Sequence, residues 1–166
     1  YTRTPVLTFG ASGLAAVWAE ENTREAIYAA FRRKETFATS GPRIRVRFFA
    51  GYGLEDGLLE APDAVARAYA GGVSMGSDLL AAGEGAPHFA AWAVGDLRSA
   101  PLQRLQIVKG WAEGNETFER VYDVACSDGG TPDPATHRCP DNGARVDLSD
   151  CSYSSDVGSQ ELKALW

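Results

Sequence analysis

The sequence is poor in the residues that most often bind zinc, and poor in positive charge. It has two histidines, His88 and His137, in different segments, and three cysteines, none of which forms a Cys-x-x-Cys pair. This spacing is unsuited to a zinc site. Acidic residues outnumber lysine and arginine by 22 to 16, which gives a net charge of −6. We therefore expect no nucleic-acid partner, since nucleic acids are held mainly by cationic surface.

Long apolar stretches are also missing. No run approaches the roughly 20 consecutive apolar residues of a membrane-spanning helix, so we expect no membrane span. Residues 1–5 do not have the composition of a signal peptide. Hydrophobic residues nevertheless make up 45% of the 166 residues and aromatic residues 10%, which is enough to form a buried core. The composition therefore predicts a globular fold.

Residues 18–35 have the pattern of a capped helix. Asn22 and Glu25 have the spacing of a reciprocal capping pair, in which each satisfies a backbone N–H at the helix start. Apolar residues follow at helical spacing. Arg32, Arg33 and Lys34 occupy the last turn, where cations interact favourably with the helix dipole. The pattern predicts a helix from about residue 23 to residue 35.

The residues after this helix alternate between arginine and apolar side chains. Gly41-Pro42 ends any helical continuation. Arg43, Arg45 and Arg47 then alternate with apolar residues, a period of two that predicts a strand with one buried face. We interpret the three arginines as the solvated face of that strand, with a row of phosphate-binding side chains as the alternative.

The rest of the chain has mostly the pattern of β-strands separated by glycine-containing turns. Strands are predicted over 86–94, 102–111 and 117–126, a further short strand around Val146 and Leu148, and a short helix over 62–70. The predicted fold is mainly β with one N-terminal helix. From residue 42 onward it is an antiparallel β-sandwich-like module.

Cys126 and Cys139 flank a loop rich in glycine, proline and aspartate. A disulfide between them would restrain this loop and contribute about 3 kcal/mol in the chain-entropy model. We favour this pairing, which would place the protein in an oxidising compartment, periplasmic or secreted. The alternative is two small buried thiols in a cytoplasmic protein.

The same region carries four aspartates, Asp123, Asp128, Asp133 and Asp141, together with glycines and backbone carbonyls. Such oxygen ligands suit Ca²⁺, but the spacing does not match an EF-hand loop. A structural calcium site is therefore a weak candidate. The favoured alternative is that the side chains accept hydrogen bonds from their own backbone in Asx-turns.

Gly72-Val73-Ser74-Met75-Gly76 matches the Gly-x-Ser-x-Gly turn that exposes the nucleophilic serine of many hydrolases. The residues before it have helical rather than strand character, so we interpret the segment as a glycine-rich loop. Neither histidine has a serine, cysteine or carboxylate partner at convincing spacing. No catalytic residue and no metal ligand is therefore assigned within the chain.

Several segments together resemble the domain-of-unknown-function 3604 family, a group of bacterial proteins similar to the polymerase-and-histidinol-phosphatase type of metal-dependent hydrolase. The segments that carry the resemblance are 18–49, 72–79, 105–111, 121–129, 139–143 and 161–166. They occur in the same order as in the C-terminal third of such proteins. The resemblance implies that the chain is a fragment, and that the His and Asp metal ligands lie upstream of it.

The resemblance also implies a division of the chain and a partner. Residues 1–41, a strap plus the helix, would close an upstream α/β barrel-like catalytic domain, which would bind the divalent metal. Residues 42–166 would be the β module, truncated at its last strand. Cys151 would pair with a cysteine beyond Trp166, and a sheet edge would be left open there. The partner of the chain would be the upstream domain of the same polypeptide.

Four residues are candidates for facing the active site of that upstream domain: Glu20, Glu21, Thr39 and Ser40. The alternative for the two glutamates is a favourable interaction with the helix N-terminus. The alternative for the two hydroxyls is turn formation.

Two hypotheses for function remain. In the first, the chain is the C-terminal part of a metal-dependent, phosphoesterase-like hydrolase, where it has a structural or substrate-cleft role and is inactive alone. In the second, it is an independent β module that binds carbohydrate or a cell-envelope partner through exposed aromatic side chains.

Overall fold

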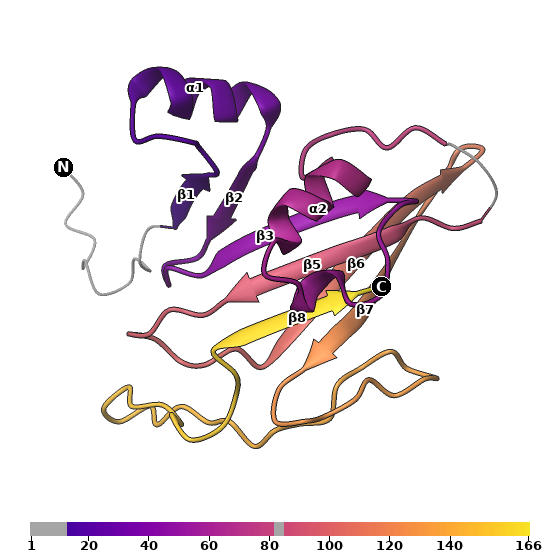
Figure 1. Cartoon of the computed structure of the whole chain (residues 1–166). Coiled ribbons are helices and arrows are strands. Elements are labelled where there is room, and N and C mark those ends of the chain that lie inside the picture. The colour runs from indigo at the N-terminus through magenta and orange to yellow at the C-terminus, as the bar shows by residue number, and fades with distance from the viewer. Residues whose placement is uncertain (1–12, 82–84) are drawn as a thin grey trace.

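A computed structural model describes residues 13–81 and 85–166 of the chain (Figure 1). The described part begins with a small unit in which a helix joins two paired strands. Strand β1 (Leu14–Val17) pairs antiparallel with β2 (Thr36–Thr39), and helix α1 (Arg24–Arg33) connects them. Neither strand is predicted by the sequence pattern, because each has only four residues.

Helix α1 begins one residue later than the predicted capping pair requires. The Oγ1 of Thr23 accepts a hydrogen bond from the backbone N–H of Ala26 at 3.3 Å, so Thr23 caps the helix rather than Asn22. The Thr23 side chain is one residue closer to the first free N–H groups of the helix, and its extended backbone is typical of an N-cap. The helix ends at Arg33, two residues before the predicted end, and is followed by the C-cap Lys34, which has left-handed backbone geometry with φ of 60°.

The central element is a four-stranded antiparallel sheet. Its strand order is β4-β3-β5-β8, with β3 spanning Arg45–Gly51, β4 Val73–Ser74, β5 His88–Val94 and β8 Glu161–Leu165. Of these four strands, β3 and β5 are predicted by the sequence, β3 from the alternation of its arginines with apolar residues. Strand β8 is formed by the last residues of the chain and lies at one edge of the sheet.

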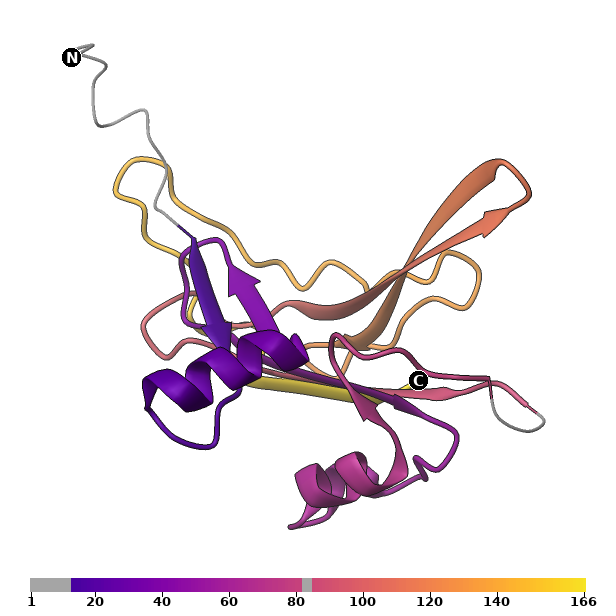
Figure 2. The same ribbon diagram turned by 90° about the horizontal axis from the view of Figure 1, so that it is seen from above.

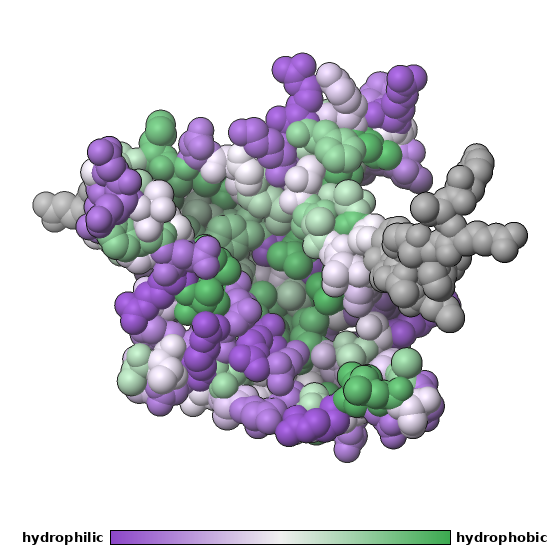
Figure 3. Space-filling model, turned by 180° about the vertical axis from the view of Figure 1, so that it is seen from behind, coloured by the Kyte–Doolittle hydropathy of each residue, from purple (hydrophilic) through white to green (hydrophobic). Residues whose placement is uncertain are grey.

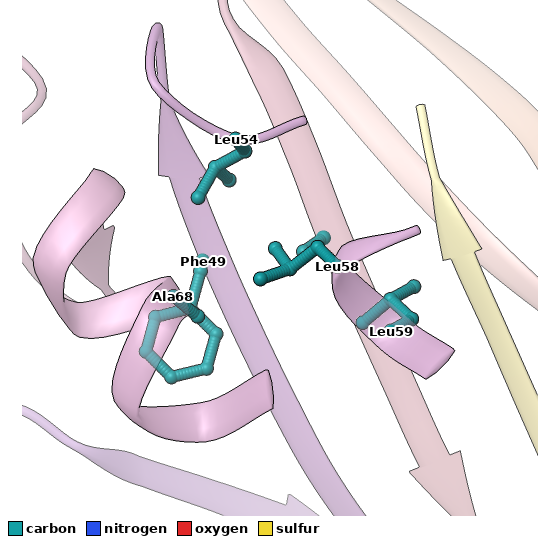
Figure 4. Close-up of a cluster of buried hydrophobic side chains, with 6 residues drawn as sticks. Phe49, Leu54, Leu58, Leu59 and Ala68 are labelled. Carbon is teal, nitrogen blue, oxygen red and sulfur yellow. The ribbon is translucent and has the colours of Figure 1, made fainter. Parts of the chain in front are cut away.

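One face of this sheet is covered by a short 3₁₀-helix, η2 (Leu58–Glu60), and by helix α2 (Ala64–Gly71). Figure 4 shows how the side chains interlock: Phe49 from β3 lies under Ala68 of α2, and Leu54, Leu58 and Leu59 fill the space beside them. Each large side chain buried in this way contributes roughly 1.5–3 kcal/mol to stability. The helix predicted at 62–70 is therefore present, and it holds the core in place.

Two long strands form a ribbon on the other side of the sheet. Strands β6 (Arg104–Glu113) and β7 (Glu116–Cys126) pair with each other over their whole length. Figure 2 shows their hairpin end projecting away from the central sheet. Near that end both faces of the ribbon are exposed.

The segment between β7 and β8 is mostly loop. The strand predicted around Val146 and Leu148 is wrong: Val146 forms only an isolated bridge with Tyr153. The physical reason is a turn directly after it, in which the carboxylate of Asp147 accepts hydrogen bonds from the backbone N–H and the hydroxyl of Ser149. With this exception the prediction of a mainly β fold with antiparallel sheets is confirmed.

Candidate functional site

A pocket of about 510 Å³ lies where the β1–α1–β2 unit meets strand β3, helix α2 and strand β4. We call it the Glu35 pocket. It is lined by Trp18, Ala19, Glu20, Arg33, Glu35, Arg47, Tyr69 and Ser74. These residues come from positions far apart in the sequence, so the pocket exists only in the folded chain.

Glu35 is the most buried ionisable group of this pocket, with a residue exposure of only 4%. One carboxylate oxygen, Oε1, accepts hydrogen bonds from the hydroxyls of Tyr69 at 2.8 Å and Ser74 at 2.7 Å. The other, Oε2, accepts from Nε and Nη2 of Arg33 at 3.2 and 3.1 Å. Both oxygens are therefore fully engaged by side-chain donors from three separate elements.

The local backbone explains why Glu35 points inward. Lys34 turns the chain out of α1 through its left-handed geometry, and this rotates the next side chain towards α2. Gly76 packs directly on this turn: a Cβ atom at Gly76 would lie 2.3 Å from the Cβ of Lys34, and its own φ is +79°. Only glycine fits this contact without a shift of the backbone.

The hydrogen bonds keep Glu35 ionised. Burial alone raises the pKa of Glu35, but the donors Ser74, Tyr69 and Arg33, together with the positive charge of Arg33, outweigh that effect and hold the pKa below its ordinary value of 4.5. The pKa of Tyr69 is raised, first by burial and then by its bond to the Glu35 carboxylate, while Arg47 acts in the opposite direction. The carboxylate is therefore charged and the phenol protonated at neutral pH.

Arg47 differs from Arg33 because no carboxylate in the described part of the chain forms an ion pair with it. Its guanidinium carbon lies 3.7 Å from the centre of the Trp18 ring. The Trp18 indole is itself fixed, since its Nε1 donates to the carbonyl oxygen of Val46 at 2.8 Å. The interpretation of the arginines as a solvated face holds for Arg43 and Arg45, which are exposed, whereas Arg47 is half-buried in the pocket.

Ser74 does not have the surroundings of a hydrolase nucleophile. Its hydroxyl donates to a carboxylate rather than to an imidazole. His88 lies elsewhere, with Nδ1 at 2.7 Å from the carbonyl oxygen of Leu54, and the His137 ring contacts Tyr122. Neither histidine lines the pocket, so the glycine-rich loop has a structural role in holding Glu35.

Of the four residues predicted to face a cleft, one lies at the pocket. Glu20 is on its rim and exposed, while Glu21 is exposed and does not line it. Thr39 accepts a hydrogen bond from the backbone N–H of Gly41 at 3.3 Å, as expected for a turn residue. Ser40 lies exposed in the same turn.

The disulfide between Cys126 and Cys139 is present, which confirms that prediction. The loop that it closes is also tied down by Asp123, whose side chain is completely buried. This carboxylate accepts from the backbone N–H of Cys139 at 2.7 Å and from Gln106 at 2.6 Å, and it pairs with Arg104. Burial raises the pKa of Asp123, but these partners outweigh burial and lower the pKa overall.

The four aspartates considered for calcium are not gathered at one point. Asp128 accepts from Ser127 and Gly158, Asp133 from the backbone and hydroxyl of Thr136, and Asp141 from Gly143 and Arg145. Within residues 13–81 and 85–166 no group of three or more His, Cys, Asp or Glu side chains has an arrangement that could hold a metal ion. Asp133 and Asp141 thus make the turn-type bonds that the alternative interpretation described.

A second, apolar pocket of about 680 Å³ lies between the central sheet and the β6–β7 ribbon. Seen from the side opposite α2, apolar residues gather around a hollow in the middle of the molecule (Figure 3). Phe48, Phe89 and Trp166 form its floor, with ring centres of successive pairs 5.8 Å apart. The pocket offers apolar contact and few polar groups.

Sequence reasoning missed Glu35, Tyr69 and the special position of Arg47. One available signal was an acidic residue directly after three cations at the end of a helix, where a glutamate is unfavourable unless it has partners. Arg33 is close in sequence, but the other two partners, Tyr69 and Ser74, lie 34 and 39 residues further along the chain. No local pattern connects them.

The fold and the Glu35 pocket define a mainly β, disulfide-containing protein with a polar, arginine-lined pocket. The chain belongs to the family described as "Protein of unknown function (DUF3604)", whose sequence model matches residues 1–166. No curated protein and no solved structure matches the chain. Among the described helices, none combines the length and apolar character needed to cross a membrane.

Proposed function

We propose that the chain is the C-terminal part of a metal-dependent, phosphoesterase-like hydrolase, in which the Glu35 pocket forms one wall of the substrate cleft. The observation that carries the proposal is the pocket itself. It is open, it contains a guanidinium without a carboxylate partner, and it lies at the junction of residues 1–41 with the β module. The family resemblance of the sequence supplies the reaction class.

The residues of this pocket do not fit a metal ion. Both oxygens of Glu35 already accept hydrogen bonds, and the other carboxylate of the pocket, Glu20, has no second carboxylate or histidine beside it among the lining residues. We therefore assign binding and orientation of the substrate to this chain and no chemical step to it. The metal and its ligands belong, in this proposal, to polypeptide preceding Tyr1.

The test compares the complete gene product with the 166-residue chain in the hydrolysis of p-nitrophenyl phosphate and bis-p-nitrophenyl phosphate. The complete product is expected to release nitrophenol with Mn²⁺ or Zn²⁺ and to lose this activity in EDTA. The chain alone is expected to show no turnover. Metal-independent turnover by the chain alone, or no hydrolysis by the metal-loaded complete product, would contradict the proposal.

A second candidate function, binding of carbohydrate or an envelope partner, is favoured by one observation. The rings of Trp111 and Phe118 stack at 5.4 Å on the β6–β7 ribbon, and each residue is more than a third exposed. Lys109 lies 5.5 Å from the Trp111 ring. An exposed aromatic pair with a polar neighbour suits the apolar face of a sugar.

Trp111→Ala separates the two candidates, because Trp111 lies on the ribbon and does not line the Glu35 pocket. The substitution is expected to leave hydrolysis by the complete product unchanged. Loss of binding to immobilised polysaccharide in the same variant would instead support the second candidate.

A further inference from the structure

We propose that the Glu35 pocket binds a single carboxylate group of its ligand, held by the guanidinium of Arg47 and set apart from the bond that is cleaved. The inference rests on the proposed function in taking this pocket for the substrate cleft. It goes further by naming the chemical group that the pocket recognises.

The charges of the pocket show that Arg47 alone is available. Arg33 is committed to Glu35 through two hydrogen bonds to the same oxygen, so this pair is neutral as a unit. Each oxygen of Glu35 already accepts two hydrogen bonds, so Glu35 is not available to pair with Arg47. A half-buried guanidinium without a carboxylate partner is available to form charge-assisted hydrogen bonds with an anionic group of a ligand.

The packing of Arg47 fixes the direction from which such an anion would come. The Trp18 ring covers one flat face of the guanidinium at 3.7 Å. The N–H groups of arginine lie in the plane of the guanidinium, so stacking on Trp18 does not engage them. The Tyr69 hydroxyl lies close enough to accept one hydrogen bond from Arg47, and no carboxylate in the described part of the chain takes the other donors. Trp18 is held by its own hydrogen bond to Val46, so the donor fork is oriented before any ligand arrives.

The charge balance favours a carboxylate over a phosphate monoester. With Arg33 and Glu35 neutralising one another, Arg47 contributes one positive charge and Glu20 on the rim one negative charge. A planar carboxylate carries one charge and matches the guanidinium fork with two parallel hydrogen bonds. A phosphate monoester carries nearly two charges, and the second would face Glu20 with no cation left to balance it.

The remaining lining suits a ligand with a polar, hydroxylated body. The Glu20 carboxylate can accept hydrogen bonds from hydroxyl groups of a ligand, and so can the lone pairs of the Ser74 hydroxyl. Trp18 also lines the pocket and offers an apolar surface beside them, with Arg47 and Phe37 covering part of its ring. A sugar acid combines these three features: a carboxylate, hydroxyl groups and an apolar ring face.

The test uses three probes with the same sugar ring: D-glucuronate, D-glucose and D-glucose 6-phosphate. Their binding to the 166-residue chain is followed by titration calorimetry and by Trp fluorescence at neutral pH. Wild-type chain is expected to bind glucuronate more tightly than glucose or glucose 6-phosphate. Arg47→Met is expected to weaken glucuronate binding by about tenfold or more, the loss of one charge-assisted pair.

Two variants serve as controls. Arg45→Met removes the same charge two residues earlier on the same strand, at a position that does not line the pocket, and is expected to leave binding unchanged. Glu20→Gln removes the negative charge on the rim and is expected to improve binding of glucose 6-phosphate relative to glucuronate. Circular dichroism and the urea midpoint of each variant confirm that it is folded.

Three results would overturn the inference. Preference of the wild-type chain for glucose 6-phosphate would identify the pocket as a phosphate site. Equal weakening by Arg45→Met and Arg47→Met would indicate a general charge effect of the strand. Absence of glucuronate binding to the folded chain would refute the carboxylate assignment. It would not refute the proposed function, because metal-dependent hydrolysis by the complete gene product is measured separately.

Discussion

Replacing Glu35 by glutamine tests whether the carboxylate stabilises the fold as its contacts indicate. The amide oxygen can still accept from Tyr69 and Ser74, but the amide NH₂ then faces Arg33 and loses two charge-assisted hydrogen bonds. Hydrogen bonds to charged groups contribute about 1.5–3 kcal/mol each. Because the Arg33 side chain is 47% exposed and screened by water, we expect a net loss of about 2 kcal/mol at pH 7.

Urea unfolding followed by Trp fluorescence measures this loss, since Trp18 lines the same pocket. With a denaturant slope of about 2 kcal/mol per molar, the midpoint of Glu35→Gln is expected about 1 M below that of the wild type. The pKa of Glu35 is lowered on folding, so its contribution is complete above 4.5 and is lost as the pH falls through the folded-state value. The difference between the two proteins should therefore shrink in acid.

The reasoning would be refuted by a midpoint shift near zero at pH 7, or by a difference that stays constant down to the lowest pH at which both proteins remain folded. Thr36→Ser serves as a matched control. Thr36 comes directly after Glu35, at the start of β2, and does not line the pocket. Its substitution is therefore expected to change the urea midpoint only slightly and without dependence on pH.

Three other substitutions test the elements around the sites. Joint replacement of Cys126 and Cys139 by serine should lower stability by about 3 kcal/mol in differential scanning calorimetry. Thiol titration of the unfolded, unreduced wild type should give one thiol, and three would contradict the disulfide. Asp123→Asn should cost about 3 kcal/mol, since it removes the charge from a fully buried group with arginine partners, and should speed proteolysis in the 127–138 loop; unchanged cleavage would argue against that clamp. Gly76→Ala should lower the melting temperature more than Gly114→Ala, where the backbone is also left-handed but nothing lies within 4 Å. Equal shifts would mean that the contact at Gly76 is unimportant.

The elements that the sequence predicted well are those whose periodicity is long enough to be read locally. Strand β3 is predicted by the alternation of arginines with apolar residues, of which Arg45 and Arg47 lie within the strand. Strand β7 is predicted by eleven residues of strand composition. Strands β1 and β2 have only four residues each, too few for any alternation to stand out. They form because α1 brings them together, which is a tertiary effect.

The candidate site is harder to predict from the sequence than the long strands, because it too depends on contacts between distant segments. Arg47 has the same sequence pattern as Arg45, and only the position of Trp18, which approaches from another segment, distinguishes the two. The burial of Glu35 depends on α2 and on the glycine-rich loop, whose packing cannot be inferred from spacing. The sequence shows this loop as a Gly-x-Ser-x-Gly motif, but in the structure the hydroxyl of its serine donates a hydrogen bond to the carboxylate of Glu35.

The two arginines of the Glu35 pocket differ in how freely evolution can change them. Replacing Arg33 would leave the buried Glu35 carboxylate without its positively charged partner. Such mutations would be removed by selection on folding, whatever their effect on ligand preference. The Glu35 carboxylate has no hydrogen bond to Arg47, Trp18 or Glu20 in the described part of the chain, so these residues can change without disturbing it. Among relatives with this fold, we expect a change of ligand to be accompanied by substitutions at these three positions, while Glu35 and its partners Arg33, Tyr69 and Ser74 stay constant.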